Sequence, residues 1–223
     1  SFMRIAIDLQ GVQSEGSRNR GIGRYSKDFI KSLIKHNQDN EYVLVANASL
    51  QNVSDDFHDE LKKENVYYYH WYSPTPLDYI SNKHYLAKIA IYLRTYSFNR
   101  LHCDLVLITS YFEGFSDNSF TSFDLKKINA PVIVIFYDLI PLLNPALYLK
   151  DNKVFDQFYN LKLNELKQVN GLLSISNSAA EEAQKFLNFK QDSVFNISSA
   201  CDEKLFNISP CEFASNRINS LDN

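Results

Sequence analysis

The chain has 223 residues, 45% of them hydrophobic and 22% charged, an ordinary globular composition that can bury the core of one α/β domain. Its formal net charge is −3, so no basic field argues for binding to nucleic acid. The three cysteines form no C-x-x-C pair and the five histidines show no metal-ligand spacing, which argues against zinc or dithiol redox motifs and favours reduced thiols in the cytoplasm.

The chain opens with the pattern of a strand, a loop, a glycine pair and a helix. Residues 4–10 interleave isoleucine and leucine with alanine and aspartate, as a strand covered on both faces does. After Gly21 and Gly23, apolar residues recur every three or four positions up to residue 36, which predicts a helix. A helix that starts at glycines offers backbone N–H groups and its positive end to an anion, and Arg24 adds charge there. We therefore predict a phosphate site at this turn.

The glycine pair also has a simpler interpretation, as a flexible entry into an ordinary helix. A complete dinucleotide fingerprint reads G-x-G-x-x-G and begins directly after its strand. Here residues 10–20 intervene, the third glycine position is Ser26, and the Walker lysine pattern is absent. The local pattern leaves both interpretations open.

Strand and helix patterns alternate along the rest of the chain. Further strands are predicted at residues 41–46, 66–71, 104–109, 132–136, 172–175 and 194–197. Helices are predicted at residues 55–64, 82–100, 154–169 and 176–186, the last with a cap at its first residues. This alternation predicts an α/β fold, a Rossmann-like three-layer sandwich around a mostly parallel sheet of about seven strands. We expect one domain over residues 3–206 and a linker or tail over residues 207–223, where the sequence turns polar.

The helix predicted at residues 82–100 carries both aromatic and basic side chains. Tyrosines alternate with Lys88, Arg94 and Arg100, beside a stripe of leucine, isoleucine and alanine. A basic, aromatic-rich helix can lie on an anionic membrane surface. The alternative is an ordinary helix that packs its stripe inward and solvates its lysines. Under the first interpretation, the protein lies in the cytoplasm and makes a peripheral contact with the inner face of the membrane.

The loops after the strands are the expected place for a ligand, because parallel sheets bind ligands beyond the carboxyl ends of their strands. Glu113 follows one strand end, with Tyr111 beside it; its carboxylate can accept hydrogen bonds from sugar hydroxyls, act as an acid or base, or stabilise its own loop. Asp138 follows the most apolar strand, with Tyr137 beside it; a charge so near a core has a partner or caps its own loop.

Several stretches, taken in order, resemble the amino-terminal domain of GT-B glycosyltransferases of the large retaining group called family 4. RIAIDLQGVQ and SRNRGIGRYSKDFIKSLIK look like the opening of that domain. LITSYFEGFSDNSFTSFD and VIVIFYDLIPLLNPALYL resemble segments of the polysaccharide mannosyltransferase branch. LLSISNSAAEEAQKFL with SVFNISSACDEKLF is similar to the last strand–helix–strand before the interdomain crossover. Together they cover residues 3 to about 206.

The resemblance implies a two-domain enzyme whose first domain binds mainly the acceptor and whose second binds mainly the nucleotide-sugar, with GDP-mannose as the candidate donor. Gly21 and Gly23 would face the donor's diphosphate across the cleft, and Arg24 would add charge to that site. No cofactor and no metal are implied. Retaining transfer in this fold is commonly drawn as front-face attack, in which the leaving phosphate helps to remove the proton.

The resemblance also implies roles around the transferred sugar. Asp138 would be the catalytic residue, beside the sugar or the acceptor hydroxyl. Tyr137 stands where many relatives have histidine, so a histidine-based role has no support. Tyr111, Glu113 and Tyr137 would bind the acceptor sugar, a glycan or a lipid-linked glycan.

The family's second domain carries a pair of spaced glutamates that this chain lacks. We therefore interpret the chain as the acceptor-binding half of a retaining hexosyltransferase, with mannosyl transfer in bacterial surface polysaccharide synthesis as the expected reaction and little or no activity alone. One alternative is a non-catalytic Rossmann-like binding or scaffold module. Another is an unrelated flavodoxin-like or dinucleotide-binding domain, which is weakened by the missing glycines and by the absence of an acidic residue at the second strand end, Ala46-Asn47.

Overall fold

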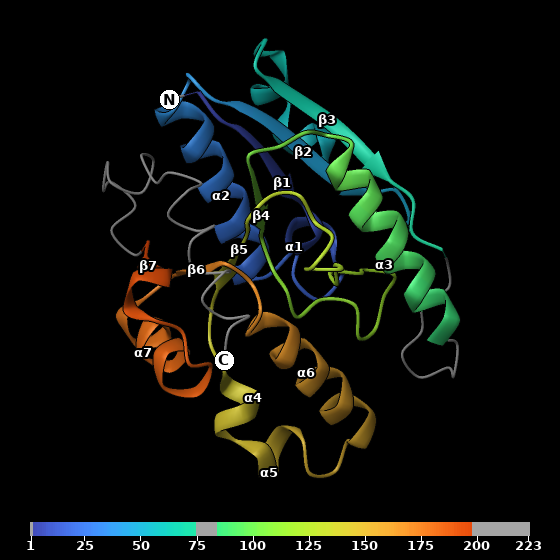
Figure 1. Cartoon of the computed structure of the whole chain (residues 1–223), viewed down its shortest axis with the longest axis vertical. Helices are drawn as coiled ribbons and strands as arrows, with labels where there is room; N and C mark the ends of the chain where they lie inside the picture. The colour runs from blue at the N-terminus through green and yellow to red at the C-terminus, as the bar shows by residue number, and fades with distance from the viewer. Residues whose placement is uncertain (1, 75–83, 198–223) are drawn as a thin grey trace.

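A seven-stranded sheet forms the centre of the computed structural model, which describes residues 2–74 and 84–197. Every neighbouring pair of strands is parallel, and the order is β3-β2-β1-β4-β5-β6-β7 (Figure 1). The strands are β1 (Arg4–Asp8), β2 (Glu41–Asn47), β3 (Val66–Trp71), β4 (Leu105–Ile108), β5 (Val132–Phe136), β6 (Gly171–Ser174) and β7 (Val194–Asn196). The predicted Rossmann-like α/β fold is confirmed.

Helices cover both faces of the sheet and make it the middle layer of three. Buried side chains form two apolar clusters, one on each face, because successive side chains of a strand point to opposite sides. The helix α2 (Gly21–His36) packs on one face. The other face is covered by α3 (His84–Asn99), α6 (Lys153–Leu166) and α7 (Asn177–Phe186).

Most predicted elements are present with slightly different bounds. Residues 55–64, predicted as one helix, instead form two 3₁₀ turns, η1 (Ser54–Phe57) and η2 (Glu60–Lys62). Four further short helical segments lie where no helix was predicted, because a single turn is too short to show a period: α1 (Gln10–Gln13), α4 (Ile140–Leu143), α5 (Pro145–Tyr148) and η3 (Gln191–Ser193).

Two further predictions concern the cap of the last helix and the tail at the carboxyl end of the chain. The predicted cap of α7 is present, since the Ser176 Oγ accepts a hydrogen bond from the Ala179 N–H at 3.1 Å. The tail predicted at residues 207–223 lies outside the described residues. Over residues 2–74 and 84–197, no helix has the length and apolarity that a membrane crossing requires.

The direction in which strands are added to the sheet reverses between β1 and β4. From β1 the chain continues to β2 and β3 on one side, and from β4 to β5, β6 and β7 on the other. In an open parallel sheet this reversal leaves a crevice at the carboxyl ends of the two central strands. The loops after β1, β4 and β5 are therefore the ones that can build a site together.

A buried ion pair joins the end of β1 to α3. The Arg94 Nη1 lies 2.7 Å from the Asp8 Oδ2, and both side chains are fully buried. The guanidinium also lies against aromatic rings, with its Cζ 4.1 Å from the ring centroid of Phe123 and 4.9 Å from that of Phe98. The sequence analysis did not predict that Arg94 is buried. A carboxylate that ends a central strand needs a counter-charge, and the helix supplies it.

The same carboxylate organises the loop that follows β4. Asp8 accepts hydrogen bonds from the backbone N–H and the side-chain amide of Gln10. That amide in turn donates to the Phe120 carbonyl and accepts from the Phe120 N–H, both at 2.7 Å. Gln10 also accepts a hydrogen bond from the side chain of Asn47 at the end of β2. Buried polar groups thus tie the ends of β1 and β2 to one loop.

The Arg94→Leu variant tests the importance of this ion pair. The change leaves the Asp8 carboxylate buried without its cation, so we expect the free energy of unfolding to fall by about 3–5 kcal/mol. Urea denaturation measures the difference. Lys88→Leu, at an exposed position of the same helix, is the control and should change stability by less than about 0.5 kcal/mol. If both variants lowered the free energy of unfolding by the same small amount, the ion pair would not be important for stability.

Candidate functional site

A pocket with a volume of about 300 Å³ lies beyond the carboxyl ends of β4 and β5. Its walls come from the segment before α2, the loop after β4, the end of β5 and one side of α6. Aromatic rings form part of the lining, and the ring centroid of Phe115 lies 5.1 Å from that of Phe155 and 5.5 Å from that of Phe158. The carboxylates of Glu113 and Asp138 belong to the same lining. The structure thus brings these two predicted residues together.

Glu113 is a buried carboxyl whose hydrogen bonds come from hydroxyl groups. It is 6% exposed, and its Oε1 accepts a hydrogen bond from the Ser110 Oγ at 2.9 Å and another from the Ser17 Oγ. Burial raises the pKa of Glu113, and the serine hydroxyls lower it in part. A carboxyl in such a setting exchanges a proton closer to neutral pH than a surface glutamate does.

The turn after Glu113 explains why this side chain faces the pocket. Gly114 has a φ of 105°, which side chains with a Cβ rarely adopt. A Cβ there would lie 2.2 Å from the Ser119 carbonyl oxygen, so the glycine also lets residue 119 approach closely. The chain therefore turns directly after Glu113, and the residues that follow the turn also line the pocket.

Tyr137 forms part of the pocket wall between α2 and β4. Its hydroxyl lies 2.7 Å from the Ser26 Oγ and 3.2 Å from the Thr109 carbonyl oxygen. The ring of Tyr25 packs edge-on against it, with 6.0 Å between the centroids. Burial raises the pKa of the phenol, so it stays neutral. Tyr137 thus connects the first turns of α2 to the end of β5.

Tyr111 lies in the wall with its hydroxyl directed to α6. It is 1% exposed, and its hydroxyl donates a hydrogen bond to the Glu165 Oε2 at 3.0 Å. Beside this contact Lys162 is fully buried, and its Nζ donates to Thr121 and Ser122 at 2.9 and 2.8 Å. Burial lowers the pKa of Lys162 to about 8. The sequence analysis missed this cluster, because a lysine three residues before a glutamate on a helix is typical of an exposed pair.

Asp138 lies at the rim of the pocket and is exposed. Its Oδ1 accepts a hydrogen bond from the Ile140 N–H at 3.2 Å, so the carboxylate caps the start of α4. That is one of the two local roles expected for it. A carboxylate has about four acceptor positions, so one such contact leaves capacity for a ligand.

The glycine turn borders the same pocket through Ile22. Gly21 and Arg24 are exposed, and a Cβ on Gly21 would meet no atom within 4 Å. Gly23 is different, because a Cβ there would lie 2.4 Å from the Ser17 carbonyl oxygen and 2.7 Å from the Cα of Arg18. The space above Gly23 that was expected for a phosphate is filled by the chain itself. Its N–H also donates to the Ser17 carbonyl oxygen at 3.0 Å.

The fold and the pocket define the class as a Rossmann-like α/β domain with a ligand pocket at its topological switch point. In the part of the chain that the structure describes, no group of three or more His, Cys, Asp or Glu side chains could hold a metal ion. No protein family model matches the chain.

The relatives found by sequence are named as mannosyltransferases. Over 224 aligned residues the chain is 33% identical to a serotype-specific mannosyltransferase WbdA of Escherichia coli, covering 98% of the chain and 26% of that protein. Two other WbdA sequences of the same species are 33% identical over 165 residues and 30% identical over 196 residues, covering 74% and 86% of the chain but 20% and 23% of their own lengths. The chain thus spans about a quarter of these relatives, which confirm its resemblance to the mannosyltransferase branch of the glycosyltransferases.

Solved structures are also similar to the chain. One of them is the UDP-GlcNAc 2-epimerase from Neisseria meningitidis bound to UDP-GlcNAc, with a TM-score of 0.45 and 13% sequence identity. The similarity covers 88% of this chain and 46% of the epimerase chain.

The two glycines of the turn give a matched stability test. Gly23→Ala places a Cβ against the backbone of residues 17 and 18, so we expect the free energy of unfolding to fall by about 1–3 kcal/mol. Gly21→Ala has open space and adds a better helix former, so it should be neutral or stabilising by up to about 1 kcal/mol. Guanidinium denaturation of both variants measures the contrast. A stable Gly23→Ala variant would show that the space above Gly23 is available after all.

Proposed function

We propose that the chain is the acceptor-binding domain of a nucleotide-sugar-dependent retaining hexosyltransferase that transfers mannose in the synthesis of a bacterial surface polysaccharide such as lipopolysaccharide. The observation that carries the proposal is Glu113, a carboxyl held by hydroxyl groups in an aromatic-lined pocket at the switch point. The name of the relatives, serotype-specific mannosyltransferase, supports the choice of sugar. Activity would belong to a longer protein with a second, donor-binding domain, and the chain alone would have little.

The pocket suits one ring of a sugar acceptor. The C–H face of a sugar packs on aromatic rings such as those of Phe115 and Phe155, while its hydroxyls need polar partners. Glu113 offers a carboxyl that can accept a hydrogen bond from one hydroxyl, and Tyr111 and Tyr137 complete the wall. Because the pocket is partly enclosed, such a hydrogen bond competes less with water than it would on an open surface.

The start of α2 supports a role in binding the donor's diphosphate. Gly21 and Arg24 are exposed there, at the positive end of a sixteen-residue helix. Gly23 would act indirectly, because the close contact with Ser17 that it permits gives the turn its shape. GDP-mannose is the proposed donor. The charge of Arg24 and of the helix end would meet the diphosphate without a metal ion.

Asp138 is the proposed catalytic residue. It lies in the same lining as Glu113 and is exposed at the rim, on the side where a second domain would present the donor. In the proposed front-face reaction the acceptor hydroxyl attacks the anomeric carbon from the side of the leaving diphosphate, and a phosphate oxygen takes the proton. Asp138 would orient the sugar or the attacking hydroxyl during this step.

The Glu113→Gln variant of the complete enzyme tests acceptor binding. Loss of a charge-assisted hydrogen bond should raise the KM for a mannosylated acceptor by about 10- to 100-fold and leave the KM for GDP-mannose unchanged. Glu64→Gln changes an exposed glutamate and serves as the control. Steady-state kinetics with both substrates separates the two constants. A complete enzyme that binds the acceptor but transfers from no nucleotide-sugar would favour the scaffold module instead.

The Asp138→Asn variant tests catalysis separately from folding. Because the side chain is exposed and makes one local hydrogen bond, its melting temperature should stay within a few degrees of the wild type. The kcat of the complete enzyme should fall by at least about 100-fold. Activity near that of the wild type would restrict Asp138 to its capping role.

A further inference from the structure

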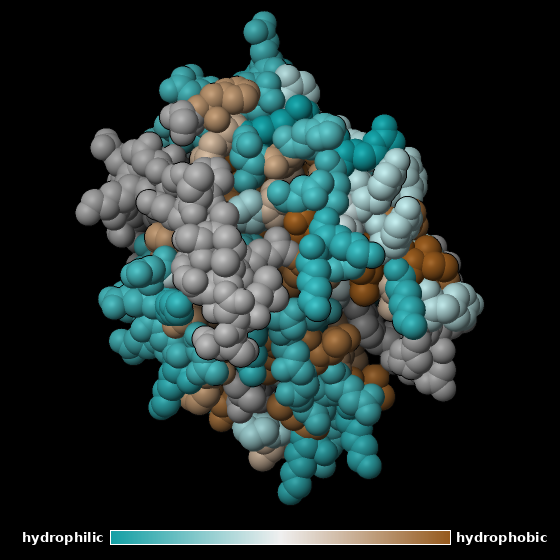
Figure 2. All heavy atoms as spheres, viewed as in Figure 1, coloured by the Kyte–Doolittle hydropathy of each residue, from teal (hydrophilic) through white to brown (hydrophobic). Residues whose placement is uncertain are grey.

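The outward face of α3 is a continuous aromatic surface. Tyr85, Ile89, Tyr92 and Tyr96 follow one another at spacings of three and four residues, so they lie on one side of the helix. Their exposed fractions are 61%, 45%, 68% and 51%. The rings of Tyr92 and Tyr96 stack nearly parallel, with 6.3 Å between their centroids and 7° between their planes. Figure 2 shows pale side chains and brown apolar atoms together over this helix, at the right of the view.

Packing of the domain does not require this surface. The inward side of α3 already contributes Ala90, Arg94 and Phe98 to the core. The outward side of α2, a helix of equal length, carries charged residues such as Arg24 and Asp28, as the solvent-facing side of a helix usually does. An aromatic outward face on α3 therefore needs another explanation.

Basic side chains flank the tyrosines. Lys88, between Tyr85 and Ile89, and Arg100, after Tyr96, are exposed, and the Arg100 guanidinium lies 5.7 Å from the ring centroid of Tyr96. Residues 84–99 include no aspartate or glutamate. The surface is locally cationic, although the whole chain has a net charge of −3.

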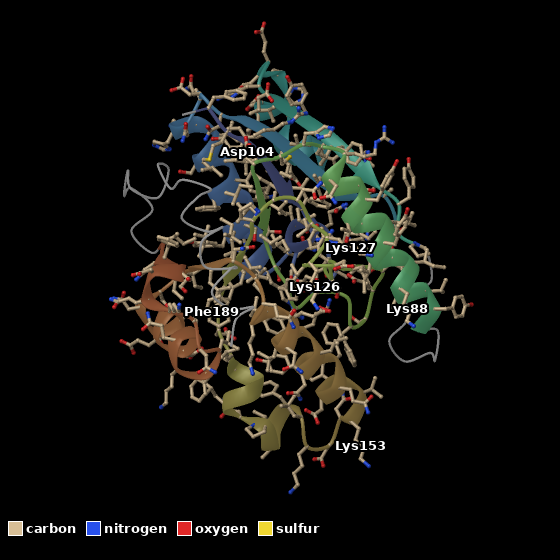
Figure 3. The ribbon with its side chains drawn as sticks, viewed as in Figure 1. Lys88, Asp104, Lys126, Lys127, Lys153 and Phe189 are labelled. Carbon is tan, nitrogen blue, oxygen red and sulfur yellow. The ribbon has the colours of Figure 1, made fainter. Side chains whose placement is uncertain are left out.

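A turn docked on the end of α3 adds two more cations. Lys126 and Lys127 are both exposed. Their turn is held to the helix by hydrogen bonds from the Asn99 side chain to the Lys127 carbonyl oxygen at 2.9 Å and from the Asp124 N–H to the Thr95 Oγ1 at 3.0 Å. Figure 3 shows Lys88 on α3 and the two lysines of the turn beside that helix. Asp124 is half-buried and caps its own turn by accepting the Lys126 N–H.

We propose that this surface, made of the tyrosines of α3 with Lys88, Arg100, Lys126 and Lys127, binds an anionic phospholipid membrane. Tyrosine rings suit the headgroup level of a bilayer, where one end of the ring is apolar and the other is wet. Four cations around them match the negative charge of phosphatidylglycerol or cardiolipin headgroups. The helix would lie parallel to the membrane plane.

The composition of the surface favours a lipid over a glycan. A sugar site pairs aromatic rings with groups that accept hydrogen bonds from hydroxyls, as the pocket around Glu113 does. The exposed charged side chains named here around the α3 tyrosines, Lys88, Arg100, Lys126 and Lys127, are donors, which suit phosphate oxygens.

Vesicle co-sedimentation of the 223-residue chain tests the proposal. We expect binding to vesicles of phosphatidylethanolamine with phosphatidylglycerol, and at least tenfold weaker binding to vesicles of phosphatidylcholine or in 0.5 M salt. Replacing Tyr92 and Tyr96 together by serine, or Lys126 and Lys127 together by glutamate, should each reduce binding at least tenfold. Because all four side chains are exposed, the melting temperatures of these variants should stay close to that of the wild type.

Two controls use residues of the same types far from α3 in the structure. Tyr148→Ser on α5 and Lys153→Glu at the start of α6, labelled at the bottom of Figure 3, change exposed side chains and should leave vesicle binding intact. Equal binding to neutral and anionic vesicles would overturn the proposal. So would loss of binding in the controls, or binding of the surface to purified polysaccharide without any binding to vesicles.

Discussion

The buried ion pair between Asp8 and Arg94 is the contact on which the rest of the site depends. A fully buried carboxylate is stable only when a cation balances its charge and its remaining acceptor positions are used. Asp8 meets this condition because it accepts hydrogen bonds from Gln10 as well as from Arg94. Gln10 in turn forms two hydrogen bonds with the backbone of Phe120. The loop that carries Glu113 is therefore held from the end of β1, although more than a hundred residues separate them in sequence. The pocket is a consequence of this polar network as much as of the apolar core.

Two buried acidic side chains, Asp8 and Glu113, and the half-buried Glu165 of α6 differ in their partners, and the difference indicates which of them serve the structure and which is available for chemistry. Asp8 is paired with Arg94, and Glu165 lies 3.9 Å from the Lys162 Nζ. The hydrogen bonds of Glu113 come from serine hydroxyls instead, which stabilise its charge less than a cation would. A carboxyl in that position has a raised pKa and faces a pocket. The residue with the least compensated charge is thus the one placed where a ligand can reach it.

The sequence predicted the strands well because long apolar runs, such as residues 132–136, leave few alternatives for a buried parallel strand. It also placed Glu113 and Asp138 at strand ends, which is where they lie. It could not predict that Arg94 and Lys162 are buried, because periodicity shows which side of a helix is apolar and does not show a long side chain reaching polar partners on another element. The sequence could not predict the packing role of Gly23 for a related reason. A glycine that admits a ligand and a glycine that admits its own chain look the same in sequence.

The helix α3 brings these arguments together. Because aromatic residues lie on both sides of α3, its sequence does not separate into one apolar and one polar face. The sequence therefore allowed two interpretations of this helix. Inside, Arg94 neutralises Asp8; outside, tyrosines and lysines form the surface assigned to the membrane. A helix held to the membrane by one face and to β1 by the other fixes the orientation of the sheet relative to the lipid. Through Gln10 and Phe120 the same contacts hold the loop of Glu113, so the proposed membrane contact would keep the pocket at a constant height above the bilayer.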